Sequence, residues 1–269
     1  MKKRIKIFCT WELEIDFESE KQVELYVDQV PPSPHDGSVI RIVFLLEPPT
    51  FINLTAPILN NQHLFDYVLT HNEDILGASE KAILFEGLWS WVKELDVKQT
   101  KKYEVSTVAG FKMISEGHTI RRELWANQQR IQCPKKFFLS HQHKGLENID
   151  NNPILGSKME DKISMFDSQF HIAIESTKRT NFFTEKLLDA LITKTVPIYY
   201  GCPNIGDWFN VKGMICVNTT EDIVSACNSL SEDTYASMLD NVEENFQIAK
   251  QYVNIGERLR EKIEYLIKT

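Results

Sequence analysis

Cysteines are few in this sequence, and they lack the spacings by which cysteines usually act together. The five cysteines are an odd number and form no CxxC or CxxH pair, so the sequence predicts neither a disulfide framework nor a zinc site. No apolar stretch approaches the roughly 20 residues of a membrane-spanning helix, and the short alternating run after Met1 is unlike a signal peptide. We interpret that run as a β-strand and expect a reducing compartment, which favours the cytoplasm.

Positive charge is also scarce over the chain as a whole. The 30 Lys and Arg residues face 38 Asp and Glu residues, which gives a formal net charge of -8. A protein that binds nucleic acid through its phosphates needs a cationic face, so nucleic acid is not an expected partner. Local basic pairs at 101–102, 121–122 and 178–179 suit either a small anionic ligand or a solvated surface.

Several motifs of nucleotide and metal binding are missing. Neither GxGxxG nor the Walker lysine motif occurs, which argues against dinucleotide oxidoreductases and P-loop nucleoside triphosphatases. His141 and His143 fall on one face of a predicted strand, but no neighbouring carboxylate or cysteine completes a ligand set. The sequence therefore predicts no metal site.

Strands and helices alternate through most of the chain. With 269 residues, of which 42% are hydrophobic, the chain is long enough for one large or two small domains. Short β-branched runs between turn residues predict strands at 5–9, 38–46 and 67–70, and further strands are predicted at 104–109, 137–140, 170–175, 196–200 and 213–217. Helical periodicity is found at 117–131, 183–191, 221–230 and 232–268, with weaker candidates at 21–27 and 87–95. This alternation is typical of βαβ units in a parallel sheet, and so of an α/β fold.

The segment from Ser176 to Lys186 joins a predicted strand to a predicted helix. Ligands of such sheets bind beyond the carboxyl ends of the strands, where helix N-termini offer N–H groups to anions. Thr184 is placed to cap the helix, Glu185 to accept hydrogen bonds from two sugar hydroxyls, and Lys186 to face a phosphate. Each is equally an ordinary helix-start residue, because the helix dipole favours Glu in the first turn.

A longer motif surrounds these residues. It runs Phe170-His-Ile-Ala-Ile-Glu-Ser-Thr, then Phe183-Thr-Glu-Lys-Leu-Leu-Asp-Ala-Leu, then Val196-Pro-Ile-Tyr-Tyr-Gly-Cys-Pro-Asn. With ungapped spacing over 170–204, it resembles the donor-site motif of glycosyltransferase family 10, the inverting α1,3/4-fucosyltransferases that use GDP-fucose. The resemblance implies that Glu185 binds the ribose and Lys186 the diphosphate. It also implies a GT-B fold, with two facing Rossmann-like domains and a C-terminal helix that packs across both.

Two weaker matches lie upstream in the order that the family requires. The first is Val105-Ser-Thr-Val followed by Glu116-Gly-His-Thr-Ile-Arg-Arg-Glu, and it puts Arg121 in the place of an arginine that holds the donor phosphates. Arg122 is the second choice, and a solvated helical arginine is the alternative. The other match is Phe44-Leu-Leu-Glu47-Pro-Pro, where the resemblance makes Glu47 the general base that deprotonates the acceptor hydroxyl. The alternative is a surface glutamate in a loop.

The chain departs from the family pattern at two expected donor-binding positions. Ser176 replaces an asparagine and Phe182 replaces a tyrosine. Ser176 still offers a hydroxyl for a phosphate, whereas Phe182 offers only its ring face. These changes weaken the prediction of fucose and keep two alternatives open: a transferase for another nucleotide sugar, or a non-catalytic protein of the same fold that binds nucleotide or carbohydrate.

The resemblance and the residues lead to one set of expectations. Residues 1–125 form an acceptor-binding Rossmann-like domain, and residues 126–269 form the donor-binding domain with the C-terminal helices. The donor is GDP-fucose and the acceptor a glycan, with no permanently bound cofactor. No metal is expected, because Asp-x-Asp is absent and cationic side chains with helix N–H groups neutralise the leaving diphosphate. We expect a cytoplasmic enzyme of glycan biosynthesis, of bacterial or viral origin, with peripheral membrane contact left open.

Overall fold

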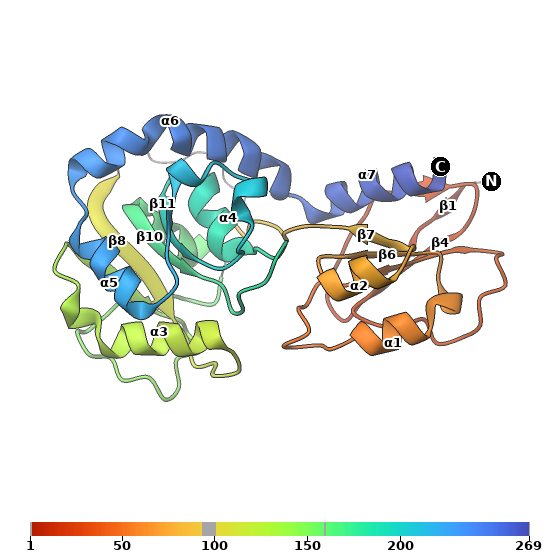
Figure 1. The fold of residues 1–269 in the computed structure, drawn as a ribbon, viewed down its shortest axis with the longest axis horizontal. Helices are drawn as coiled ribbons and strands as arrows, with labels where there is room; N and C mark the ends of the chain where they lie inside the picture. Colours follow the sequence, from red (N-terminus) through yellow and green to blue (C-terminus); the bar gives the residue numbers. More distant parts are fainter. Residues whose placement is uncertain (1, 93–100, 159, 269) are drawn as a thin grey trace. The chain divides into compact units, whose positions relative to one another are not determined.

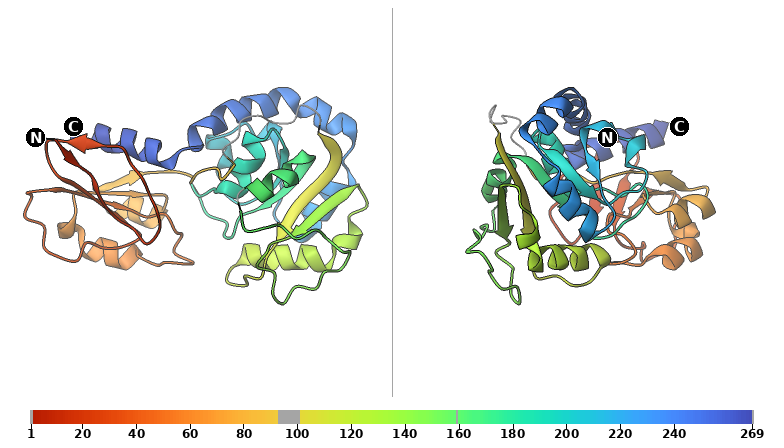
Figure 2. Two further views of the ribbon diagram at one scale, coloured as in Figure 1. Left: turned by 180° about the vertical axis from the view of Figure 1, so that it is seen from behind. Right: turned by 60° about the vertical axis from the view of Figure 1, so that its left-hand side comes forward.

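The computed structural model describes residues 2–92, 101–158 and 160–268, and Figures 1 and 2 show its ribbon. The chain divides into two compact units. The first contains the described residues up to 88, residues 180–182, and those from 254 onward; the second contains the described residues of 89–179 and 183–253. The boundary predicted at residue 125 falls at the end of a helix inside the second unit, because this helix packs on the second sheet.

The first unit contains a five-stranded parallel sheet in the order β2-β4-β5-β6-β7. Its strands are β2 (Lys6–Phe8), β4 (Val23–Val27), β5 (Ile40–Phe44), β6 (Tyr67–Thr70) and β7 (Ala82–Leu84). A small antiparallel pair, β1 (Lys3–Arg4) and β3 (Glu18–Ser19), precedes it. The strands predicted at 5–9, 38–46 and 67–70 are confirmed.

The weak helix prediction at 21–27 is wrong, because this segment contains strand β4. Val23, Leu25, Tyr26 and Val27 are all buried. A segment of five residues that is buried on both faces of a parallel sheet loses the alternating pattern that marks a strand. Its β-branched residues were the better signal.

Helices cover both faces of the first sheet. Helices α1 (Thr55–Asn60) and α2 (Glu73–Ala78) contact each other, and Figure 1 shows α7 (Ile255–Lys268) on the opposite face. The core beside α1 and α2 consists of Tyr26, Val43, Leu45, Ile58, Phe65, Val68 and Ile75. On α7, Arg258 donates hydrogen bonds to the carbonyl oxygens of Glu86 and Leu88, both at 2.8 Å. The first unit therefore requires the C-terminal helix.

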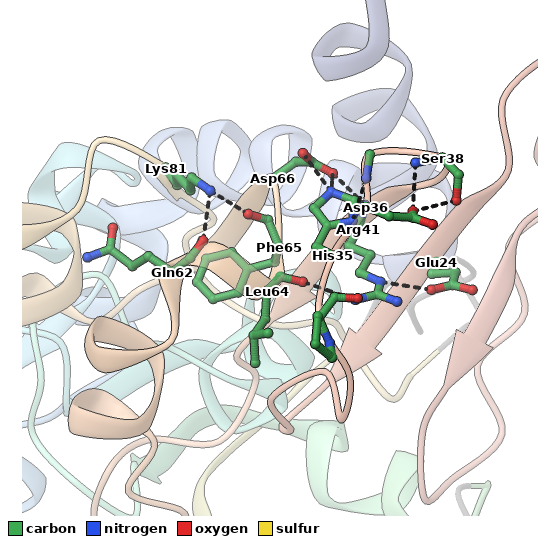
Figure 3. A network of polar contacts seen from close by, with 12 residues as sticks. Glu24, His35, Asp36, Ser38, Arg41, Gln62, Leu64, Phe65, Asp66 and Lys81 are labelled. Atoms are coloured by element: carbon green, nitrogen blue, oxygen red, sulfur yellow. Dashed lines mark hydrogen bonds and ion pairs between the residues drawn. The ribbon is translucent and has the colours of Figure 1, made fainter.

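Polar contacts around Arg41 fasten the proline-rich loop before β5 (Figure 3). The guanidinium of Arg41, whose residue is 9% exposed, donates to Glu24 Oε2 at 3.2 Å and to the carbonyl oxygen of Ser33 at 2.8 Å. Asp66 accepts a hydrogen bond from the Arg41 backbone N–H at 2.8 Å and lies 2.9 Å from His35 Nε2. The loop that carries Ser33 and His35 is thus tied to three neighbouring strands or their ends.

The second unit contains another five-stranded parallel sheet, in the order β12-β11-β10-β8-β9. The strands are β8 (Lys102–Ala109), β9 (Lys135–Leu139), β10 (Ser168–Ile174), β11 (Val196–Tyr200) and β12 (Ile215–Cys216). All five were predicted from the sequence. β10 and β11 lie side by side although a helix separates them along the chain, as in a right-handed βαβ unit.

Four helices enclose this sheet in two layers (Figure 1). Helices α4 (Glu185–Ile192) and α6 (Glu232–Ala249) contact each other and β11. Helices α3 (Glu116–Ala126) and α5 (Thr220–Asn228) contact each other, and α3 contacts β8 and β10. Separate hydrophobic cores fill the two faces, which is the doubly wound arrangement expected of a Rossmann-like domain.

Some helix bounds differ from the prediction. The helix predicted at 117–131 ends at Ala126 and continues as the 3₁₀ segment Gln128–Arg130. The periodic stretch 232–268 is two helices, α6 and α7, separated by the 3₁₀ segment Lys250–Tyr252. The break lets the chain return from the second unit to the first. Residues 87–92 of the weak helix candidate are irregular, and its last residues lie outside the described part. No helix in the described ranges is both long and apolar enough to cross a membrane.

Candidate functional site

Glu175 connects the carboxyl end of β10 to the start of α4. Its side chain is fully buried, and its carboxylate accepts hydrogen bonds from the backbone N–H of Thr184 at 2.8 Å and from the Thr184 hydroxyl at 2.7 Å. Burial raises the pKa of Glu175, and the nearby Lys186 opposes that rise. The strand end and the helix start are therefore held together by a carboxylate inside the protein.

Two glycines pack directly against this strand end. A Cβ atom on Gly117 would lie far closer than 3.0 Å to the carbonyl oxygen of Glu175 and 2.8 Å from that of Ser176. A Cβ atom on Gly201 would lie 2.6 Å from Cγ of Glu175. Gly117 is not among the predicted site residues; its position in the first turn of a helix, where glycine is unfavourable, was the available signal. Both glycines permit close approach of backbone to the site.

Arg121 lies one turn after Gly117 on α3, and its side chain points inward to β10. Its Nε donates to the carbonyl oxygen of Ile174 at 3.1 Å, and its Nη2 donates to the same oxygen. Burial lowers the pKa of Arg121, while Glu175 and Glu185 oppose that change. A guanidinium nevertheless stays charged at neutral pH. Arg122 donates instead to the carbonyl oxygen of Gly145, at 3.4 Å.

The start of α4 holds the predicted Thr-Glu-Lys sequence. Thr184 is the N-cap, and its hydroxyl accepts a hydrogen bond from the Lys186 N–H at 3.3 Å. The Lys186 ammonium lies 2.7 Å from Glu185 Oε1 and 4.0 Å from Glu175 Oε2. Burial alone would raise the pKa of Glu185, but Lys186, Lys162 and Thr184 outweigh it and lower that pKa. Glu185 is therefore an ionised acceptor.

Three backbone N–H groups at this helix start are bonded to groups of the protein itself. The N–H of Thr184 is bonded to Glu175, that of Lys186 to the Thr184 hydroxyl, and that of Leu187 to the Thr184 carbonyl oxygen at 3.1 Å. An anion is the predicted partner of this helix start, and these three groups are already bonded within the protein.

His118 lies in the first turn of α3, on the same helix as Arg121. The residue is 6% exposed, and its Nδ1 lies 2.6 Å from the Ser115 hydroxyl. Burial, together with Arg121, Lys112 and Lys186, lowers the pKa of His118 to about 4. Arg121 and Lys186 thus both contribute to the electrostatic environment of this ring, next to the carboxylates of Glu175 and Glu185.

The other predicted site residues are divided between the units. Ser176 is buried next to Glu175, and its carbonyl oxygen accepts a hydrogen bond from the Gly117 N–H at 3.1 Å. Phe182 belongs to the first unit, where it is 2% exposed and its ring centroid lies 4.8 Å from that of His71. This contact favours a packing role for Phe182. Glu47 is an exposed residue of the first unit, after β5.

Three residues of the second unit extend the site beyond the prediction. Lys162, in the 3₁₀ segment Glu160–Asp167, interacts electrostatically with Glu185. Its ammonium lies 3.4 Å from the ring centroid of Trp91. The backbone N–H of Trp91 in turn donates to Asp189 on α4, at 2.7 Å. No sequence spacing links these three residues, since the fold alone brings them together. Within the described ranges, no three His, Cys, Asp or Glu side chains are grouped to hold a metal ion.

The burial of Asp189 predicts how the free energy of unfolding depends on pH. The residue is 3% exposed, and burial raises its pKa from 3.8 to about 6. Because the folded state binds this proton more tightly than the unfolded state, the contribution of Asp189 to stability falls as pH rises from about 4 through about 6 and is lost above that. In Asp189→Asn this falling limb should disappear, and the variant should exceed wild type at neutral pH by up to about 3 kcal/mol.

Asparagine is a matched substitution, because Asp189 uses a single oxygen. Oδ1 accepts hydrogen bonds from the Ser90 hydroxyl at 2.8 Å and from the N–H groups of Trp91 and Val92 at 2.7 and 3.0 Å. An amide oxygen accepts the same bonds without a charge. Urea unfolding at about pH 4.5 and about pH 7.5 tests the prediction. Equal pH dependence of variant and wild type would refute the raised pKa.

Known proteins are similar to this chain in sequence over a small part of its length, and in structure over most of it. No protein-family profile matches the chain. The α-(1,3)-fucosyltransferase FucT of Helicobacter pylori is 29% identical over 76 residues, which cover 26% of this chain and 16% of that protein. The chain thus aligns with less than two thirds of its curated relative.

Solved structures of glycosyltransferases share the fold. Anabaena HepE in complex with UDP-glucose has a TM-score of 0.64 at 10% identity, over 91% of this chain and 78% of that one. TarM has a TM-score of 0.63 at 13% identity, over 92% and 55%. An α1,3-fucosyltransferase with GDP has a TM-score of 0.50 at 15% identity, over 86% and 77%. The chain therefore has the predicted GT-B fold, and its sequence is similar to the α1,3-fucosyltransferases that its donor-site motif resembles.

Proposed function

We propose that the chain is an inverting glycosyltransferase that moves fucose from GDP-fucose to a hydroxyl of a glycan, without a metal ion. One observation carries the proposal: at the carboxyl end of β10, Arg121 donates to the carbonyl oxygen of Ile174 at 3.1 Å, and the Lys186 ammonium lies 4.0 Å from the carboxylate of the adjoining Glu175. The sequence likeness to H. pylori FucT and the donor-site motif support the choice of donor. An odd number of cysteines favours a cytoplasmic setting.

In the proposed donor site, different side chains bind different parts of the nucleotide. Arg121 and Lys186 bind the diphosphate and stabilise the negative charge that accumulates on GDP as it leaves. Glu185, which its neighbours keep ionised, accepts hydrogen bonds from the ribose hydroxyls. Ser176 is the candidate for a further phosphate contact. This division assigns the donor to the second unit and the acceptor to the first.

Glu47 is the proposed general base. As the acceptor oxygen bonds to the anomeric carbon, its proton passes to the Glu47 carboxylate, and the bond to the diphosphate breaks with its electron pair on GDP. A single displacement of this kind inverts the anomeric centre. Because cationic side chains neutralise the departing diphosphate, the step requires no metal.

A transferase for another nucleotide sugar is the second candidate. Ser176 and Phe182 are the residues that favour it, because both replace family residues with greater hydrogen-bonding capacity. Measuring hydrolysis and transfer of GDP-fucose, other GDP-sugars and UDP-sugars separates the two candidates. Binding of GDP without turnover of any donor would instead indicate a non-catalytic protein.

Replacing Lys186 with alanine tests the phosphate site. We expect Lys186→Ala to weaken GDP binding by about 10- to 100-fold, because hydrogen bonds to charged groups contribute about 1.5 to 3 kcal/mol. Isothermal titration of GDP and UDP measures the effect and the base preference. The control is Lys212→Ala, an exposed lysine of the same unit. Normal GDP affinity in Lys186→Ala would show that the site is misplaced.

A further inference from the structure

Lys162 is a half-buried cation of the second unit that packs on an aromatic ring. Its ammonium lies over the face of Trp91, 3.4 Å from the ring centroid, a position in which the negative face of the aromatic ring attracts a cation. Burial lowers its pKa, and the carboxylates of Glu185 and Asp189 oppose that change. Lys162 is thus a partly desolvated charge that rests on an aromatic ring and interacts electrostatically with two acids.

Lys162 is connected to α4 through Trp91, whose backbone is bonded to Asp189 on that helix. Glu185 and Asp189 are one helical turn apart, on the same face of the helix. Asp189 fixes the segment that carries Trp91, through three hydrogen bonds to residues 90–92. Trp91 supports the Lys162 ammonium, which interacts electrostatically with Glu185. Trp91, which Asp189 fixes, therefore holds a second cation near the face of α4 that carries Glu185.

A second cation near Glu185 matters because Lys186 has two assigned partners. In the structure the Lys186 ammonium pairs with Glu185 Oε1 at 2.7 Å, yet the proposed function assigns the same ammonium to the donor phosphates. When it turns to a phosphate, Glu185 loses its nearest positive partner while Glu175 remains close by as a like charge. A desolvated carboxylate without a partner tends to take up a proton. A protonated Glu185 is a poorer acceptor for ribose hydroxyls.

We propose that Lys162, seated on Trp91, is a positioning residue that keeps Glu185 ionised and aimed at the ribose while Lys186 binds the donor phosphates. The inference rests on the proposed function and adds a determinant of ribose recognition to it. Lys162 acts through Glu185 and does not touch the phosphates. Its removal should therefore affect discrimination between riboses more than affinity for the diphosphate.

Titration of GDP and 2′-deoxy-GDP separates these effects. Wild type should prefer GDP by about tenfold or more, the contribution of one hydrogen bond to a charged group. Lys162→Met keeps the length of the side chain and removes its charge, and we expect it to reduce the preference to less than about threefold. Lys212→Met, an exposed lysine of the same unit, should keep the wild-type preference.

Substitutions of Lys162 and of Trp91 test the charge and the aromatic ring contact separately. Lys162→Arg retains a cation that stacks on an aromatic ring, so the preference for GDP should be retained. Trp91→Phe keeps a ring face, whereas Trp91→Leu removes it, and only the leucine variant should lose discrimination. The bond from the residue-91 N–H to Asp189 is a backbone bond, so neither substitution removes it. Thermal melting checks that every variant is folded.

The outcomes separate this inference from the function on which it rests. If wild type binds no GDP, the proposed donor site itself is wrong. If wild type binds GDP but does not distinguish the two riboses, Glu185 has no ribose role and the inference is overturned. If Lys162→Met distinguishes them as well as wild type does, the inference alone is overturned. Loss of discrimination in Lys162→Met, with rescue in Lys162→Arg, supports it.

Discussion

Replacing Glu47 with glutamine should lower the turnover of sugar transfer by about 10²-fold or more while GDP binding stays unchanged. Glutamine keeps the size and the hydrogen-bonding oxygen of the side chain but cannot take the proton of the acceptor hydroxyl. The proposed base lies in the first unit and the proposed donor site in the second. Turnover with GDP-fucose should therefore fall in this variant, while the affinity measured by titration with GDP should equal that of wild type.

The backbone around Glu47 supports a fixed position for the base. The N–H groups of Leu46 and Glu47 both donate to Asp28 Oδ1, at 2.8 and 3.1 Å. Asp28 follows β4 and has a φ of 50°, a left-handed conformation that aspartate adopts more readily than most residues. These bonds hold the turn after β5 independently of the Glu47 side chain, so Glu47→Gln should fold as wild type does.

A matched control for Glu47 comes from the same unit. Glu80 is an exposed glutamate after α2, and Glu80→Gln should leave turnover unchanged. A panel of glycan acceptors is required, because the sequence does not identify the acceptor. Wild-type turnover in Glu47→Gln would eliminate this residue as the base. An equal loss of GDP affinity would indicate structural damage in place of a chemical role.

Gly117→Ala should destabilise the second unit and abolish tight GDP binding together. Alanine normally stabilises a helix relative to glycine, by roughly 0.5 to 1 kcal/mol. Here the added methyl group would meet the carbonyl oxygens of Glu175 and Ser176 at impossible distances, and both are backbone atoms that cannot turn aside. The start of α3 must therefore shift away from β10, at a cost of about 1 to 3 kcal/mol or more.

The shift should reach the donor site because Arg121 is one turn further along α3. Its hydrogen bonds to the Ile174 carbonyl oxygen depend on the present position of the helix. Thermal melting and GDP titration measure the two effects. Gly206→Ala is the control in the same unit, since its Cβ atom would lie 3.4 Å from Val211 Cγ1, an ordinary contact. Unchanged melting of Gly117→Ala would show that α3 and β10 do not touch.

The sequence predicted the second sheet well because its strands are short apolar runs, and a clear helix separates β8 from β9 and β10 from β11. β10, α4 and β11 were found with their order and their approximate ends. The Thr184 cap was also foreseen, since Thr before Glu-Lys and an apolar run is a local signal. Local signals of this kind survive without knowledge of the fold.

Features that depend on distant contacts could not be foreseen. Val23–Val27 was mistaken for a weak helix because burial on both faces hides the alternation of a strand. The contact of Gly117 with Glu175 joins segments that are far apart in sequence, as does the seat of Lys162 on Trp91. The unit boundary depends on which sheet each helix covers, and α3 covers the second.

The contribution of α7 to the first unit affects the order in which the chain folds during synthesis. Its apolar face, with Ile255, Leu259, Ile263 and Leu266, is buried, although the strands of that unit end at Leu84. On the ribosome, those strands emerge early and must wait with one face uncovered, whereas the second unit has all of its residues by Val253. Synthesis from the N-terminus therefore favours completion of the second unit first, which leaves the first sheet with one face uncovered until α7 has been made.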